Sequence, residues 1–205
     1  MIIAALEGPS YAGKSTAITL LRPTLPTGTV MFDCYVQQIK WAADIPPART
    51  RSAAEQLAAF EVFMAIEADR VKHLAHMAAE QRIDLVIADR SVDTLLAHAH
   101  ALDHLYGFGV YAQATDRLKS LPHLTPDRTF YLDADPDTVQ LRRQRQGDRD
   151  DYFLHDRSFL AHTRDYFLGP ARSPIARQVI PIAAGTIPAA EIAWKIGSLL
   201  GPVRR

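Results

Sequence analysis

A short glycine-containing segment near the start of the chain constrains its fold most strongly. The segment matches the pattern G-x-x-x-x-G-K-[S/T] at every fixed position and reads Gly8-Pro9-Ser10-Tyr11-Ala12-Gly13-Lys14-Ser15. It follows the apolar run 2–6, and its two glycines let the backbone turn tightly. Successive N–H groups and the start of the next helix then converge on one point, which binds phosphate groups. The segment therefore predicts a nucleotide-binding loop between a strand and a helix.

Two side chains of this loop predict the bound nucleotide and its metal ion. Lys14 supplies a mobile positive charge that can follow a transferred γ-phosphoryl group, and the Ser15 hydroxyl is suited to hold Mg²⁺. We therefore expect ATP and Mg²⁺ as cofactors. The loop residues expected at the ATP are Gly8, Tyr11, Ala12, Gly13, Lys14, Ser15 and Thr16.

Composition narrows the class of protein. The chain has 205 residues, which fits a single domain over 1–205, and its 23 basic residues balance its 23 acidic ones. A chain without net charge has no general electrostatic attraction to a nucleic-acid polymer. No apolar run reaches the roughly 20 residues of a membrane span. The lone Cys34 and the lack of an export signal lead us to expect a cytoplasmic protein without a membrane partner.

Apolar runs alternate with segments of helical periodicity along the whole chain. This alternation predicts an α/β fold with a parallel sheet. The expected strands are 2–6, 29–32, 83–88, 129–132 and 178–183. The expected helices are 14–22, 52–81, 92–105, 111–120, 135–145, 153–167 and 188–200.

Asp89 follows one of these buried strands and begins the sequence Asp89-Arg90-Ser91. Ligands of open α/β sheets bind at the carboxyl ends of the strands, so both charged side chains are candidates for chemistry. Asp89 could hold Mg²⁺ through water, accept the proton of an attacking hydroxyl, or only cap the next helix. Arg90 could contact the acceptor or a transferring phosphoryl oxygen.

Four arginines gather within eight residues around Gly147. They are Arg142, Arg143, Arg145 and Arg149. Arginines carried by a closing segment would stabilise the charge of a transferring phosphoryl group and exclude water, so we expect a basic lid over 141–152. Arg145 and Arg149 are the expected catalytic residues, and Arg142 is expected at the ATP. The alternative is a solvated helix end whose arginines pair with neighbouring aspartates.

Arg70 interrupts the apolar stretch of the long helix 52–81. It could reach a base edge or a phosphate of the acceptor, with Phe60, Phe63 or Met64 stacking nearby. Alternatively, Arg70 forms an exposed pair with Glu67, three residues earlier on the helix.

Taken together, these residues resemble the thymidylate kinase group of P-loop nucleoside and nucleotide kinases along nearly the whole chain. The matching segments are Glu7–Thr16, Ala68–Arg70, Asp89–Ala97, Asp133–Pro136, Gly147–Asp151 and Ile182–Thr186. The resemblance implies a P-loop kinase fold, with a five-stranded parallel sheet flanked by helices. It also implies that Ala184 lies at the adenine, that Arg70 contacts the acceptor, and that the chain can form a homodimer.

The departures from the family pattern concern the acceptor. Ser10 and Tyr11 replace the usual Asp-Gly, and no Arg-Glu-Pro follows the second strand. That missing arginine binds the acceptor monophosphate in thymidylate kinases. The sequence Asp89-Arg90-Ser91 is similar to the motif of deoxynucleoside kinases, whose general base follows the second strand, where Asp33 stands here. The acceptor-binding candidates are Ser10, Asp33, Arg70 and Arg90.

The sequence therefore predicts ATP-dependent phosphoryl transfer to a small molecule, either a nucleoside monophosphate or a closely related nucleoside. Two other hypotheses stay open. One is a kinase of another small hydroxylated metabolite or antibiotic, and the other is a nucleotide-dependent switch or binding module.

Overall fold

The computed structural model describes residues 1–147, 153–171 and 174–201, which form one five-stranded sheet and the helices around it. The strands are β1 (Ile2–Glu7), β2 (Thr29–Phe32), β3 (Leu85–Asp89), β4 (Arg128–Asp133) and β5 (Val179–Ala183). The α-helices are α1 (Lys14–Leu21), α2 (Ala53–Glu80), α3 (Val92–Tyr106), α4 (Val110–Leu118), α5 (Pro136–Gln146), α6 (Arg157–Leu168) and α7 (Ala189–Leu200).

The sheet has the order β2-β3-β1-β4-β5, and every pairing is parallel. Strand β1 lies between β3 and β4, so that Leu6 is level with Asp89 and Glu7 is level with Tyr131. The carboxyl ends of β1, β3 and β4 therefore meet at one edge of the sheet. The predicted five-stranded parallel sheet is confirmed.

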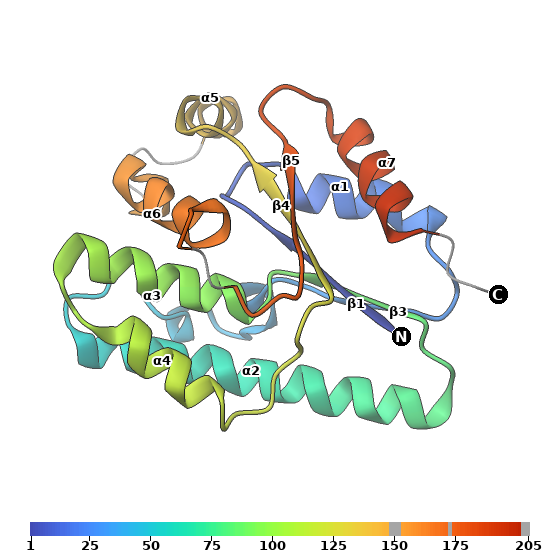
Figure 1. Cartoon of the computed structure of the whole chain (residues 1–205), viewed down its shortest axis with the longest axis horizontal. Coiled ribbons are helices and arrows are strands. Elements are labelled where there is room, and N and C mark those ends of the chain that lie inside the picture. Colours follow the sequence, from blue (N-terminus) through green and yellow to red (C-terminus); the bar gives the residue numbers. More distant parts are fainter. Residues whose placement is uncertain (148–152, 172–173, 202–205) are drawn as a thin grey trace.

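Helices cover both faces of this sheet (Figure 1), with α1 and α7 on one face and α2, α3 and α4 on the other. Strand β3 is buried along its whole length. Its Leu85 and Ile87 pack toward α1 and α7, whereas Val86 and Ala88 pack toward α2. Burial on both faces explains why this strand is a continuous apolar run in the sequence.

Each predicted helix is found, but the predicted start of the helix 153–167 needs correction. The segment 153–167 is not one helix, because Asp156 caps α6 by accepting a hydrogen bond from the Phe159 backbone N–H at 2.9 Å. The residues before it form a separate 3₁₀ turn, η4 (Phe153–His155). The other 3₁₀ turns are η1 (Arg22–Thr24), η2 (Tyr35–Gln38) and η3 (Ala42–Asp44).

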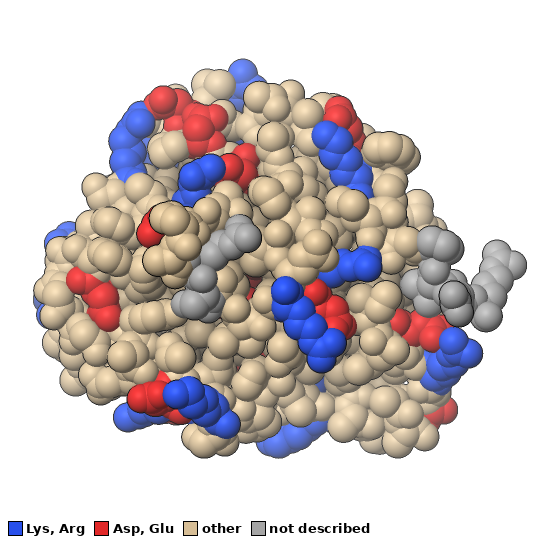
Figure 2. All heavy atoms as spheres, viewed as in Figure 1, with Lys and Arg blue, Asp and Glu red and all other residues tan. Residues whose placement is uncertain are grey.

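The surface carries charges of both signs. On the face seen in Figure 2, basic and acidic side chains are interspersed and form no continuous basic area. Among the helices of the described ranges, none has the length and apolar character to cross a membrane.

The buried carboxylate of Asp93 connects α3 to α6 and to the segment before β5. Asp93, in the first turn of α3, accepts hydrogen bonds from the Tyr166 hydroxyl at 2.6 Å and from the backbone N–H groups of Ile175 and Ala176 at 2.7 and 3.1 Å. Its side chain is fully buried, so water cannot replace these contacts. One carboxylate thus joins α3, α6 and the segment that leads into β5.

We predict that Asp93→Ala lowers the free energy of unfolding by about 3 kcal/mol, because it leaves three buried or partly buried donors without their acceptor. Urea denaturation followed by circular dichroism measures this change. The matched control is Asp69→Ala, which removes a carboxylate that is 75% exposed and should change stability by less than about 0.5 kcal/mol. Equal stability losses in the two variants would contradict the structural role of Asp93.

Candidate functional site

The phosphate loop has the backbone that its two glycines predict. Gly8 and Gly13 have φ values of 124° and 101°, in a region that side chains disfavour. A Cβ atom on Gly8 would lie 2.5 Å from the Leu132 carbonyl oxygen, so no larger residue fits. Tyr11 also has a positive φ, 64°, at a position where the family that the sequence resembles carries glycine. The loop therefore holds one strained non-glycine residue.

Lys14 begins α1 and folds back onto the loop. Its Nζ donates hydrogen bonds to the carbonyl oxygens of Gly8 and Pro9 at 2.9 and 2.8 Å. Burial, and after it the charge of Arg90, lower the pKa of Lys14 to about 7, although Asp89 opposes this effect. The ammonium group is thus held where a phosphate could replace the two carbonyl oxygens.

A phosphate-side cavity of about 620 Å³ lies against this loop. Predicted site residues from three segments line it together, namely Ser10, Tyr11, Ala12, Gly13, Lys14, Ser15, Thr16, Asp89, Arg90, Arg142 and Arg145. Gly8, also predicted at the ATP, does not line this cavity but lines a second one, described below. Arg149 lies outside the described residues, as does most of the second half of the expected lid.

Helix α5 carries the arginines of the expected lid. The Nη1 atom of Arg142 donates to the carbonyl oxygens of Tyr11 and Ala12 at 3.1 and 3.2 Å, and its Nη2 atom donates to Ala184 at 2.8 Å. Ala184 is buried and does not line the cavity. The exposed Arg145 lines the cavity one turn later. Arg142 therefore joins the phosphate loop to the loop after β5.

Asp89 lies at the end of β3 on the wall of the phosphate-side cavity. It is 7% exposed, and its Oδ1 atom has no hydrogen-bond partner among the described residues. Asp89 does not cap α3, because the Ser91 hydroxyl accepts the bond from the Asp93 backbone N–H. A buried carboxylate oxygen without a donor, together with the Ser15 hydroxyl, fits the oxygen ligands that Mg²⁺ prefers.

A second cavity of about 260 Å³ lies on the other side of Arg90. We call it the acceptor cavity. Its wall is largely apolar and includes Val36, Ile45, Leu95, Ala97, Leu154, Phe159, Leu160 and Phe167. The two cavities meet at four residues that line both, namely Ser10, Cys34, Val36 and Arg90.

Polar side chains line part of the acceptor cavity, among them those of Glu7, Thr94, His98, Tyr131 and Thr163. His98 has both ring nitrogens engaged, Nε2 with the Ala48 carbonyl oxygen at 2.8 Å and Nδ1 with the Gln56 amide at 3.3 Å. Burial lowers the pKa of His98 to about 4, so the ring is neutral at pH 7. Burial also raises the pKa of Tyr131, which keeps its phenol protonated as a hydrogen-bond donor.

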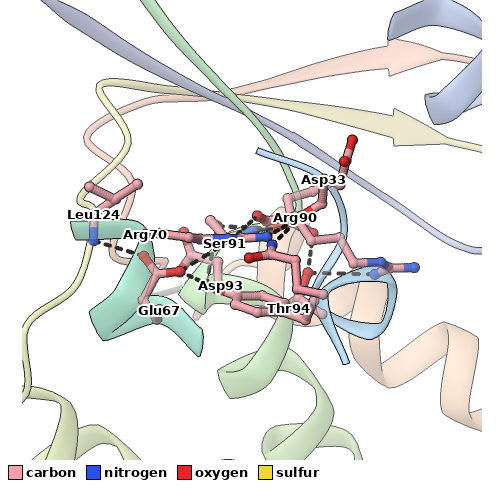
Figure 3. Close-up of polar contacts among 11 residues, drawn as sticks. Asp33, Glu67, Arg70, Arg90, Ser91, Asp93, Thr94 and Leu124 are labelled. Atoms are coloured by element: carbon pink, nitrogen blue, oxygen red, sulfur yellow. Dashed lines mark hydrogen bonds and ion pairs between the residues drawn. The ribbon is translucent and has the colours of Figure 1, made fainter. Parts of the chain in front are cut away.

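Two predicted acceptor residues lie outside both cavities. Asp33 is exposed, and its side chain points away from Arg70 in Figure 3. The side chain of Arg70 is 1% exposed and forms an ion pair with Glu67 at 3.2 Å, so the pair expected at the surface is buried. The structure does not bring Arg70 to the wall of the acceptor cavity. Its guanidinium group packs on the Tyr35 ring and bonds to the backbone after β2, and Tyr35 lines the cavity in its place.

Glu7 lies at this edge of the sheet but was not among the site residues predicted from the sequence. Glu7 is buried at the end of β1, where Oε1 accepts from the Ser91 backbone N–H at 2.7 Å and from its hydroxyl at 2.9 Å, and Oε2 accepts from the Thr94 hydroxyl. Burial raises the pKa of Glu7. The sequence signal that could have identified Glu7 is its position, because it is a carboxylate directly after the apolar run 2–6 and directly before the phosphate loop. Glu7 holds the start of α3 against the phosphate loop.

The chain is similar to known phosphotransferases along most of its length. A family model described as thymidylate kinase matches residues 6–185. The thymidylate kinase of Bifidobacterium longum subsp. infantis is 28% identical over 186 residues, which cover 82% of this chain and 72% of that protein. A solved structure of deoxyadenosine kinase from M. mycoides with bound dATP has a TM-score of 0.71 at 13% identity, with 97% of this chain and 99% of that chain covered, and it shares the fold. The chain therefore belongs to the thymidylate kinase family of P-loop phosphotransferases, which phosphorylate nucleotides or nucleosides with ATP.

Proposed function

We propose that the chain transfers the γ-phosphoryl group of ATP to the hydroxyl of an uncharged, nucleoside-like acceptor. The observation that carries this proposal is the charge of the acceptor cavity. Arg90 is the one lysine or arginine among the described residues that line it, and His98 is neutral. A dianionic monophosphate is best bound by several cationic donors. An uncharged acceptor needs none.

The size of the acceptor cavity supports the same acceptor class. A volume of about 260 Å³ lies just below the usual range of small-molecule sites, which is about 300 to 1,000 Å³. Its apolar wall suits a flat ring, and Tyr131 and Thr163 offer hydroxyl groups for orientation. A nucleoside without its phosphate fits this combination of small volume and low charge.

The donor side fits Mg²⁺-ATP. Ser15 and Asp89 would hold the metal ion, which when bound neutralises charge on the β- and γ-phosphates. Lys14 would leave the carbonyl oxygens of the loop and follow the transferred group. Arg145, carried by α5, would neutralise the equatorial oxygens in the transition state, and we keep Arg149 as a further candidate for that role.

Asp89 is our candidate for the proton acceptor. A nucleoside hydroxyl is a weak nucleophile and gains from a positioned base, whereas a phosphate acceptor is already ionised. A carboxylate has two oxygens, so one can hold a water molecule of the metal ion while the other receives the hydroxyl proton. Asp33, the other candidate from the sequence, lies outside both cavities.

The proposal includes a cytoplasmic location and small-molecule partners. A single cysteine and balanced charge are typical of a cytoplasmic enzyme with small-molecule partners. We keep the homodimer implied by the family resemblance as an expectation, and sedimentation of the purified chain tests it.

We predict that thymidine or deoxyadenosine stimulates ADP formation from Mg²⁺-ATP more than the corresponding 5′-monophosphates do. A coupled ADP assay over nucleosides, monophosphates and sugars measures this preference. Thr163→Phe, which fills the acceptor cavity, should lower kcat/KM for the acceptor by about tenfold or more without weakening ATP binding. The control is Thr19→Phe on the exposed face of α1. Preferential use of monophosphates would refute an uncharged acceptor, and ADP formation without any acceptor would favour a switch.

Replacement of Asp89 tests the proton acceptor. Asp89→Asn should lower kcat by about 10²- to 10⁴-fold, whereas Asp33→Asn should change it by less than about twofold. Steady-state kinetics of the two purified variants, which remove the same charge from neighbouring strand ends, give the comparison. A large loss in Asp33→Asn with normal turnover in Asp89→Asn would reverse the assignment.

The pKa of Lys14 predicts proton uptake on nucleotide binding. With a pKa of about 7, Lys14 is mostly neutral at pH 7.5 in the free protein, and bound phosphates would raise that pKa. Binding of Mg²⁺-ATP at this pH should therefore take up more than about half a proton. Calorimetry in buffers with different ionisation enthalpies measures the uptake. Lys14→Arg should abolish it because arginine stays charged, and equal binding enthalpies for the unmodified protein in all buffers would contradict the prediction.

A further inference from the structure

Two buried carboxylates, Glu7 and Glu67, hold the turn Asp89–Ser91, and Figure 3 shows Glu67 and Arg70 beside this turn. From β1, Glu7 accepts hydrogen bonds from Ser91. From α2, Glu67 pairs with Arg70, which donates to the Arg90 carbonyl oxygen at 3.1 Å. This turn carries the two charged side chains that line the phosphate-side cavity at the end of β3.

Arg70 joins the ends of two neighbouring strands. Its Nη1 atom contacts the carbonyl oxygen of Arg90 after β3, and its Nη2 atom donates to the carbonyl oxygen of Asp33 after β2. The guanidinium plane lies over the Tyr35 ring, with Cζ 4.0 Å from the ring centroid. A planar fork can make both bonds at once, whereas an ammonium group cannot reproduce that geometry.

Glu67 anchors Arg70 to the rest of the molecule. Its Oε2 atom accepts from the Tyr35 hydroxyl at 2.8 Å, and its Oε1 atom accepts from the Leu124 backbone N–H at 2.8 Å. The side chains of Glu67 and Arg70 are both 1% exposed. A buried ion pair seldom stabilises a fold more than apolar residues of the same volume would. Its presence here therefore calls for a reason other than stability.

The backbone of Arg90 supplies that reason. Arg90 has a φ of 72°, a left-handed conformation that a residue with a long side chain keeps only where its surroundings fix it. The bond from Arg70 fixes its carbonyl group, and the Arg90 backbone N–H donates to the Leu6 carbonyl oxygen at 3.1 Å. In this conformation the Arg90 side chain lies where the two cavities meet.

We infer that Glu67 and Arg70 are positioning residues for phosphoryl transfer, which hold Asp89 and Arg90 in their reactive geometry without touching the acceptor. This inference rests on the proposed roles of Asp89 and Arg90. It assigns to Arg70 a function different from the acceptor contact that the family resemblance implies, and it adds Glu67, which the sequence offered only as a pairing partner.

The test uses the double variant Glu67→Gln/Arg70→Met, which removes both buried charges together and leaves no unpaired ion. We expect kcat to fall by about 10²-fold, because small displacements of reacting groups have effects of this size. The KM for the acceptor and the Kd for Mg²⁺-ATP should stay within about threefold of the values for the unmodified protein. Arg70→Lys should have an intermediate kcat. Leu118→Ala, a core change on α4 away from the strand ends, controls for stability loss and should keep a normal kcat.

Two results would overturn the inference. A raised acceptor KM with a normal kcat would mean that Arg70 contacts the acceptor, and normal kinetics with only a lower free energy of unfolding would mean a purely structural pair. The variants are compared with whichever acceptor the unmodified protein uses, or by ADP formation without acceptor. If the proposed acceptor class is wrong, the unmodified protein itself shows a different acceptor preference. If this inference is wrong, only the comparison of the variants with the unmodified protein shows it.

Discussion

The parallel pairing of β1 with β3 is the constraint on which the site depends. It brings Leu6 level with Asp89, so that the strand leading into the phosphate loop and the strand leading into Asp89-Arg90 end side by side. Glu7 then bonds across this edge to Ser91 and Thr94. The nucleotide loop and the turn that carries the acidic residue are thus joined through one buried carboxylate, and neither can shift without the other.

The sequence predicted the sheet and the phosphate loop well because both follow from local patterns. Buried parallel strands are continuous apolar runs, and the loop needs glycine at Gly8, where a Cβ atom would collide with the Leu132 carbonyl oxygen. The boundary between η4 and α6 was missed, because the periodicity continues across it and only the Asp156 cap interrupts the helix. Patterns that repeat over many residues are readable from the sequence, whereas a single capping bond is easily overlooked.

The acceptor side could not be predicted to the same degree, because it depends on how distant segments pack. The spacing of Glu67 and Arg70 allows an ion pair on α2, but whether that pair faces solvent, a ligand or a strand end depends on the rotation of α2 about its axis. The structure turns it toward Tyr35 and the backbone after β2 and β3. Likewise, Cys34 rather than Asp33 lines the cavities, a difference of one residue at the end of β2 that no motif specifies.

Several groups of the candidate site are in energetically unfavourable states, and a bound phosphate or metal ion would stabilise two of them, Lys14 and Asp89. Lys14 is buried with its pKa lowered to about 7, an oxygen of Asp89 has no donor within the described part of the chain, and Tyr11 and Arg90 have left-handed backbones. By contrast, the buried carboxylates of Glu7, Glu67 and Asp93 each accept three hydrogen bonds from described residues. The unfavourable states of Lys14, Asp89, Tyr11 and Arg90 thus lie together on the wall of the phosphate-side cavity, as expected when the fold holds a site ready for its ligand.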